Sequence, residues 1–189
     1  MQMLFDELRA EVTRVKPASA ATLRPGLPSS AIRTELAKLP YQITPEAASL
    51  YQWADGADGQ LQLLPGAYFV PWRRAMEEFH IFHGMGEEMD AIFPQQYRDC
   101  FRFLTDWSDG GYAFGRVDSP SGGQIVSMCI HEEWRIGFKN LEHLLRTSIM
   151  CYRDGIIPAG EDETPDFDRF YELAARLNPG VELWRSGAE

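Results

Sequence analysis

Four short apolar runs, separated by turns rich in glycine and aspartate, lie in the second half of this 189-residue chain and constrain its fold most strongly. The runs are Cys100 to Leu104, Tyr112 to Val117, Gln124 to Ile130 and Trp134 to Lys139. Ser108 to Gly111 and Asp118 to Gly123 separate the first three runs and have the composition of hairpin turns. In the fourth run, Trp134, Ile136 and Phe138 alternate with other residues, as in a strand with one face in water. The pattern predicts an antiparallel meander.

Helical periodicity occurs on both sides of this meander. Apolar residues recur at helical spacing in the segments 4–15, 72–82, 141–152 and 167–177. Two further helix starts are indicated by Ser29 or Ser30 and by Thr44-Pro45-Glu46. Because helices and strands are segregated along the chain, the sequence predicts an α+β fold. Its mostly antiparallel sheet is flanked by helices from both chain ends.

The segments between these elements carry weaker signals. Lys16 to Pro28 shows little periodicity, which predicts a loose linker, and the turn residues Asp55 to Gly59 are expected to end the preceding helix. Leu61 to Leu64 and Ala67 to Val70 are predicted to form short strands. We expect one contiguous core to contain Leu50, Trp53, Trp72, Phe79, Phe114, Trp134, Ile136, Leu144, Leu145 and Ile149.

Acidic residues outnumber basic ones by 28 to 18, which gives a formal net charge of -10. Such a charge repels phosphate backbones and anionic lipid headgroups. Nucleic acid and acidic membranes are therefore disfavoured as partners, and a basic protein is favoured. The excess is concentrated in residues 154–189, which hold nine Asp and Glu against three Arg. That region is either a contact surface or a solvated tail.

The sequence also predicts a cytoplasmic protein. Residues 1–12 carry four charges and lack the apolar centre of a signal peptide. The longest uncharged stretch, Gly59 to Trp72, is shorter than the about 20 apolar residues that a membrane-spanning helix needs. Cys100, Cys129 and Cys151 form no C-x-x-C pair, which fits a reducing compartment.

A metal site is the first chemical hypothesis that the sequence raises. His80 and His83 are three residues apart on a predicted helix, so their side chains can share a face. No additional Cys or His set completes a ligand shell, and we favour structural roles for both. The segment from Asp55 has Gly66 at its twelfth position, where a calcium loop requires a glutamate. The sequence thus predicts neither metal nor cofactor.

Catalytic motifs are also weak. Asp106, Asp109 and the segment His131 to Glu133 are candidates for general acid and base groups, but isolated turn residues of these types are usually solvated. Common nucleophile and nucleotide-binding motifs are missing from the sequence. We therefore favour a binding protein over an enzyme with an unrecognised site.

The order of motifs resembles that of the SMI1/KNR4 family, also called the SUKH superfamily. The matching stretches are Leu39-Pro40, Thr44-Pro45-Glu46, Leu50 to Gly56, Phe101 to Tyr112, Val117-Asp118, Gly122 to Ile125, and Phe138 to Tyr152. Asp55-Gly56 stands where the family more often has Asn-Gly. The resemblance implies a mixed sheet flanked by helices and structural motifs without catalytic residues. Residues 29–155 are then the family-like core, residues 1–28 an N-terminal helix and linker, and residues 156–189 a C-terminal helical extension packed on the same domain.

Many bacterial members of this family are immunity proteins that bind and neutralise a toxin, often a nuclease or deaminase, whereas others are regulatory or scaffolding proteins. The resemblance therefore implies a non-catalytic protein-binding module whose partner is a basic toxin domain. The acidic balance fits this expectation, because charge complementarity speeds association. Trp107, flanked by acids near a turn, has the composition of an interface hot spot or of a strand-end anchor. The predicted partner-binding residues are Asp106, Trp107, Asp109, Glu161, Asp162 and Glu163.

Overall fold

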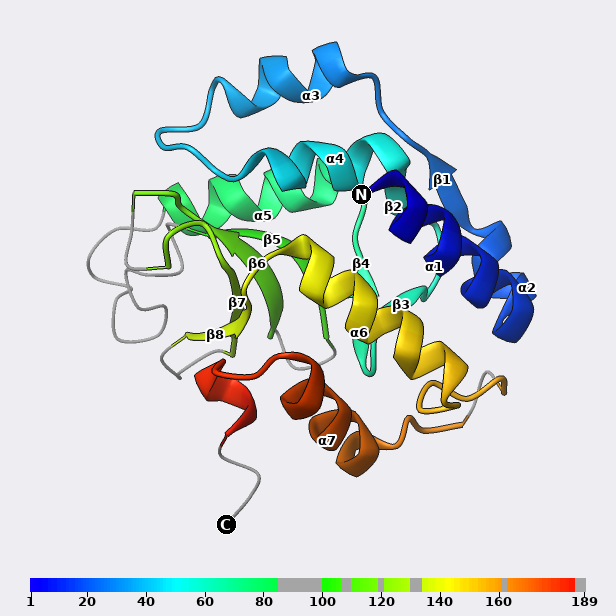
Figure 1. Cartoon of the computed structure of the whole chain (residues 1–189). Helices are drawn as coiled ribbons and strands as arrows, with labels where there is room; N and C mark the ends of the chain where they lie inside the picture. The colour runs from blue at the N-terminus through cyan, green and yellow to red at the C-terminus, as the bar shows by residue number, and fades with distance from the viewer. Residues whose placement is uncertain (85–99, 107–109, 119–120, 130–133, 161–162, 186–189) are drawn as a thin grey trace.

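In the computed structural model, the predicted meander forms four consecutive antiparallel strands (Figure 1). They are β5 (Cys100–Thr105), β6 (Gly111–Gly115), β7 (Ile125–Met128) and β8 (Arg135–Phe138). The predicted strands β3 (Gln62–Leu64) and β4 (Ala67–Phe69) extend them to a six-stranded sheet in the order β3-β4-β5-β6-β7-β8. Every described pairing in it is antiparallel, unlike the mixed sheet that the family resemblance implies.

The structure describes residues 1–84, 100–106, 110–118, 121–129, 134–160 and 163–185. Within these ranges, no helix combines the length and apolar character needed to cross a membrane.

The register places an apolar row across the sheet. Phe101 lies opposite Phe114, Phe114 opposite Ile125, and Ile125 opposite Phe138, and all four side chains are buried. Paired residues project to the same face of a sheet, so this row forms the floor of the core. At the β5–β6 turn, Gly111 has a φ of 144°, and a Cβ there would lie 2.0 Å from the Leu104 carbonyl oxygen. Only glycine fits that position.

Helices from both chain ends cover this sheet (Figure 1). The N-terminal elements are α1 (Gln2–Val15), α2 (Pro17–Ala21), β1 (Leu23–Pro25), α3 (Ser29–Leu36), α4 (Pro45–Trp53), β2 (Ala54–Ala57) and α5 (Trp72–Gly84). The C-terminal ones are α6 (Leu141–Arg153), α7 (Phe167–Leu177) and a 3-10 turn (Glu182–Trp184). Because α6 contacts both edge strands, β3 and β8, it lies across one face of the sheet, and α1 packs against α6.

Two predictions about the N-terminal half are wrong. Lys16 to Pro28 is not a loose linker, because it forms α2 and β1. The helix α4 does end at Trp53, before the segment Asp55 to Gly59, but Asp55 to Ala57 are not turn residues, because they belong to β2 and pair with β1. A strand of this kind depends on a partner about 30 residues earlier in the chain, and local sequence signals do not report such a partner.

The predicted core is largely confirmed. Eight of its ten members are buried in one cluster, and Ile136 packs against that cluster while partly exposed. Trp134 is the error, since it packs against a second cluster formed by Cys100, Ala113, Val126 and Met128. Ala113 and Val126 neighbour Phe114 and Ile125 along their strands, so they point to the opposite face of the sheet.

Residues of the family-like motifs hold elements together in this fold. The carboxylate of Asp55, on β2, accepts a hydrogen bond of 2.7 Å from the backbone N–H of Trp72 at the start of α5. Glu46 of α4 accepts one of 2.8 Å from the N–H of Leu141 at the start of α6. Both carboxylates therefore satisfy helix N-termini that belong to other segments.

Candidate protein-binding surface

A cavity of about 350 Å³, here called the α7 cavity, lies where the N-terminal half of α7 meets the ends of the central strands. Figure 1 shows α7 and the 3-10 turn at this end of the sheet. The described residues that line the cavity are Pro65, Gly66, Ala67, Asp106, Gly111, Tyr112, Ser127, Met128, Cys129, Phe167, Phe170 and Tyr171. The cavity thus combines residues from four strands or their turns with one wall from α7.

Two aromatic side chains of α7 form the open rim of this cavity. Phe167 is 40% exposed and Tyr171 is 52% exposed, although helical spacing predicts both on the buried face. That part of the prediction is wrong, because the stripe of apolar residues on α7 is wider than its contact with the core. Phe170, Leu173 and Ala174 fill the contact, and the two aromatic residues at its edge remain in water.

The position of α7 is fixed at both ends. Asp166 caps its N-terminus, since its carboxylate accepts a hydrogen bond of 3.1 Å from the N–H of Arg169. After the helix, the ring of Trp184 contacts both Phe170 and Tyr171, and its Nε1 donates a hydrogen bond to the Gly137 carbonyl of β8. The aromatic rim is therefore attached to the sheet and does not belong to a solvated tail.

Among the described residues that line the α7 cavity, the side chains with oxygen atoms supply one carboxylate and two hydroxyls. Asp106 is half-buried, and its Oδ1 accepts a hydrogen bond of 2.8 Å from the Gly110 N–H, which closes the β5–β6 turn. Tyr112 and Ser127 lie opposite each other on β6 and β7. Neither hydroxyl makes a hydrogen bond within the described part of the chain. The cavity therefore offers hydrogen-bonding groups beside apolar walls.

Electrostatics keep the Tyr112 phenol neutral. Burial raises its pKa well above the usual value, and the nearby Tyr171 and Asp106 act in the same direction. A neutral phenol both donates and accepts hydrogen bonds. Among the described residues that line the cavity, Asp106 is the one carboxylate and there is no Lys, Arg or His. The site therefore suits a group that carries positive charge.

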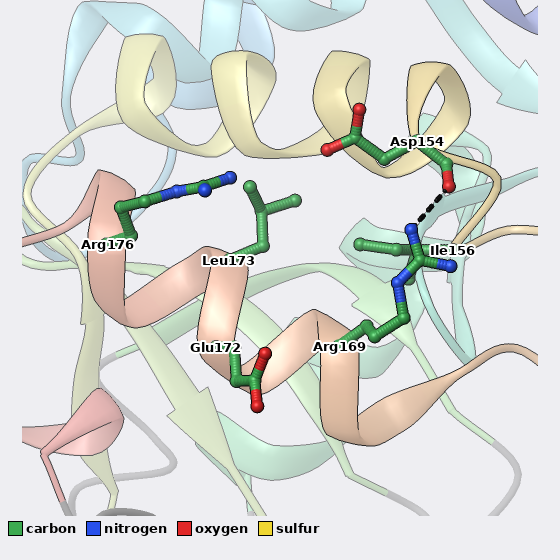
Figure 2. Close-up of a pocket in the computed structure, with 6 residues that line it drawn as sticks. All are labelled: Asp154, Ile156, Arg169, Glu172, Leu173 and Arg176. Carbon is green, nitrogen blue, oxygen red and sulfur yellow. Dashed lines mark hydrogen bonds between the residues drawn. The ribbon is translucent and has the colours of Figure 1, made fainter.

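A second hollow of about 380 Å³ lies on the other side of α7, against the end of α6 (Figure 2). Arg169 spans it and donates a hydrogen bond of 2.7 Å from Nη2 to the Asp154 carbonyl oxygen. Figure 2 shows Arg176 and Leu173 extending from α7 along the same hollow. With Asp154 and Glu172 also present, this hollow balances two arginines against two carboxylates. Because these charges balance, the hollow favours neither a basic nor an acidic partner.

The predicted partner-binding residues have different outcomes. Asp106 lines the α7 cavity, whereas Glu163 is exposed in the segment between α6 and α7 and does not line it. Trp107, Asp109, Glu161 and Asp162 lie outside the described residues. The structure therefore brings one predicted residue, Asp106, together with the C-terminal helix.

The candidates for metal binding and acid–base chemistry do not form a site in the described ranges. There, no group of three or more His, Cys, Asp or Glu side chains is arranged to hold a metal ion. His80 and His83 are exposed on α5, and each packs its ring against Phe79. His131 to Glu133 lies outside the described residues.

Tyr112, Phe167 and Tyr171 are the site residues that sequence reasoning missed. The sequence places all three in predicted strands or helices and indicates no functional role for them. For Phe167 and Tyr171, the sequence does contain a signal, because both lie at the edge of the apolar stripe of a helix that also carries acidic residues. Tyr112 gave no signal, because its place in the cavity depends on α7, more than 50 residues later.

Comparison with known proteins finds no matching family model and no matching curated protein.

Proposed function

We propose that this chain is a non-catalytic protein-binding module, and specifically an immunity protein that binds and neutralises a basic toxin domain of the nuclease or deaminase type. The observation that carries the proposal is the α7 cavity. It joins the Asp106 turn and the C-terminal helix, two regions for which the sequence separately predicts partner contacts. Exposed aromatic residues beside such a hollow are typical of interface hot spots.

Charge supports a basic partner. The acidic excess of the chain is concentrated in residues 154–189, and within that region α7 carries Asp168 and Glu172 next to its aromatic rim. Complementary charge raises the association rate with a basic domain and disfavours acidic competitors. A toxin that processes nucleic acid has a basic surface for phosphates, which makes it a suitable partner.

The proposal includes membership of the SMI1/KNR4 family and a cytoplasmic location. The α+β architecture supports the family, as do the motif residues Asp55 and Glu46, which cap helices and take no part in the cavity. A regulatory scaffold role is the alternative within the same class of function. An enzyme with an unrecognised site is the alternative outside it.

The test uses the protein encoded by the neighbouring reading frame as the binding partner. We expect biolayer interferometry to detect a complex whose association slows as salt rises, because screening at about 0.15 M limits the field to about 8 Å. Phe167→Ala and Tyr171→Ala are each expected to raise Kd about 30-fold or more, the range of hot-spot residues. Co-expression should protect cells from the neighbouring protein.

Ile81→Ala is the matched control, because Ile81 is an apolar side chain of α5 that is 58% exposed and does not line the cavity. We expect its Kd to stay within about 3-fold of the unmodified protein. Lack of a complex at low salt, together with turnover in a substrate screen, would favour the enzyme alternative. Equal effects of Ile81→Ala and Tyr171→Ala would remove the binding site from the α7 cavity.

A further inference from the structure

The two exposed rings at the rim of the α7 cavity each lie against a neighbour from another part of the chain. A Cβ built on Gly66, in the turn between β3 and β4, would lie 3.3 Å from Cζ and 3.5 Å from Cε1 of Phe167. The edge of the Phe167 ring therefore lies against this glycine. The Tyr171 ring lies beside Trp184, with the ring centroids 6.3 Å apart. Both rim residues thus have a defined contact although they are half in water.

These two neighbours are themselves held in place. The Gly66 N–H donates a hydrogen bond of 3.2 Å to Oε1 of Gln62, and the main-chain carbonyl of Gln62 accepts one from the Tyr152 hydroxyl of α6. Trp184 is buried, and its Nε1 donates to the Gly137 carbonyl oxygen of β8. The β3–β4 turn and the indole are therefore fixed supports for the rings that lie against them.

We infer that Gly66 and Trp184 are positioning residues, which hold the rings of Phe167 and Tyr171 in their binding conformations before a partner arrives. This inference rests on the proposed protein-binding function and explains how the rim would gain its affinity. Ordering one side chain of several rotamers on binding lowers affinity about 2- to 12-fold. Rings that are already ordered avoid this loss, so the affinity depends on residues behind the contact surface.

Gly66→Ala tests the support of Phe167. The only described atoms within 4 Å of the added Cβ belong to the Phe167 ring, so the ring is displaced. We expect capture of the protein encoded by the neighbouring reading frame to weaken about 2- to 12-fold in biolayer interferometry. The variant also strains the backbone, because Gly66 has a φ of 71°.

Gly155→Ala is the matched control for this strain. Gly155 has a φ of 67°, and no described atom lies within 4 Å of a Cβ built there. The two alanine variants therefore impose a similar backbone strain, and only Gly66→Ala places a methyl group against Phe167. We expect Gly155→Ala to change Kd by less than about 2-fold.

Two substitutions of Trp184 test the support of Tyr171. Trp184→Ala removes the ring beside Tyr171, and we expect Kd to rise about 2- to 12-fold. Trp184→Phe keeps an aromatic ring there, and we expect it to restore Kd to within about 2-fold. Leu145→Ala is the control for lost stability, since Leu145 is fully buried in α6 and does not line the cavity. Measured where it is folded, it should leave Kd within about 2-fold.

NMR on the full chain, without a partner, reports on each ring separately. Scalar couplings from Cγ to the backbone nitrogen and carbonyl carbon distinguish one χ1 rotamer from an average over several. We expect a single rotamer for Phe167 and for Tyr171 in the unmodified protein. Gly66→Ala should change the couplings of Phe167 alone, and Trp184→Ala should produce averaging at Tyr171 alone.

The inference is overturned if either ring averages over rotamers in the unmodified protein. It is also overturned if Gly66→Ala binds as tightly as the unmodified protein, or if Gly155→Ala and Leu145→Ala weaken capture as much as Gly66→Ala and Trp184→Ala. In these cases the proposed function stands as long as Phe167→Ala and Tyr171→Ala still weaken capture. Lack of any complex with the unmodified protein instead rejects the proposed function, and the inference with it.

Discussion

Asp55 connects three segments of the chain, and its replacement by alanine tests whether the family-like Asp-Gly motif is structural. Its Oδ1 accepts the Trp72 N–H at 2.7 Å, and its Oδ2 pairs with the Arg24 guanidinium at 3.0 Å. The residue is 5% exposed, so the Trp72 N–H would lose its partner in a buried position. Loss of a helix cap costs about 0.5 to 2 kcal/mol, and burial places Asp55 at the upper end. The half-exposed Arg24 pair adds about 0 to 1 kcal/mol. We expect Asp55→Ala to lower the free energy of unfolding by about 2 to 3 kcal/mol.

Two further variants separate the hydrogen bond from the charge. Asp55→Asn keeps an acceptor for the Trp72 N–H, so we expect it to cost about 1 kcal/mol, mainly through the lost charge near the start of α5. Arg24→Ala leaves the Trp72 hydrogen bond intact and is expected to cost at most about 1 kcal/mol. Urea denaturation followed by tryptophan fluorescence measures all three changes. The reasoning is refuted if Asp55→Asn costs as much as Asp55→Ala, or if Asp55→Ala changes stability by less than about 0.5 kcal/mol.

Three other predictions follow from the described contacts. Leu145→Ala, at a fully buried position of α6, should lower the free energy of unfolding by about 2 to 5 kcal/mol in the same urea assay, and a change near zero would contradict its place in the core. The carboxylate of Glu11 accepts a hydrogen bond from the Arg153 guanidinium, and this contact lowers the pKa of Glu11. The stability from this contact is therefore present above the ordinary glutamate pKa and is lost as pH falls through the lowered value, so Glu11→Gln should destabilise at pH 7 and have little effect near pH 2. Cys129 is half-buried in the α7 cavity, whereas burial raises the pKa of the Cys151 thiol, so a thiol reagent should modify Cys129 first, as peptide mass spectrometry can determine.

The elements that the sequence predicted correctly are those whose signals are local. The stripe on α1 buries Leu4, Phe5, Leu8 and Val12, and Asn140 caps α6 through a hydrogen bond from the His143 N–H, as its position before a leucine-rich stripe predicts. Helix periodicity and caps are properties of a few neighbouring residues. Strand periodicity is equally local, but it does not determine which face of a sheet meets the main core. Because both faces of the central strands carry apolar residues, the periodicity around Trp134 predicts the wrong cluster for this side chain.

The candidate site depends on distances in sequence that local patterns do not cover. The α7 cavity exists because a helix that begins at Phe167 packs beside strands that end near Asp106 and Ser127. The sequence identified Asp106 from its acidic turn and the C-terminal region from its charge. It gave no reason to place them together. The position of α7 is set by Trp184, which joins that helix to Gly137 of β8, and this contact spans 47 residues.

The residues that carry the family resemblance hold the fold together, whereas the exposed rim of the α7 cavity lies outside them. The residues that carry the resemblance lie between positions 29 and 155, and two of them, Asp55 and Glu46, are occupied in capping helices. Gly56 is also required by the fold, because its φ is 69° and a Cβ there would lie 2.4 Å from the Pro71 nitrogen. Substitutions at these positions change stability before they change recognition. The exposed rim of the α7 cavity has the opposite property, since Phe167 and Tyr171 are half in water and can change with small cost to folding. If the proposed function holds, partner choice is therefore encoded mainly in α7, outside the segment that resembles the family, and motifs shared with other members do not predict which toxin is bound.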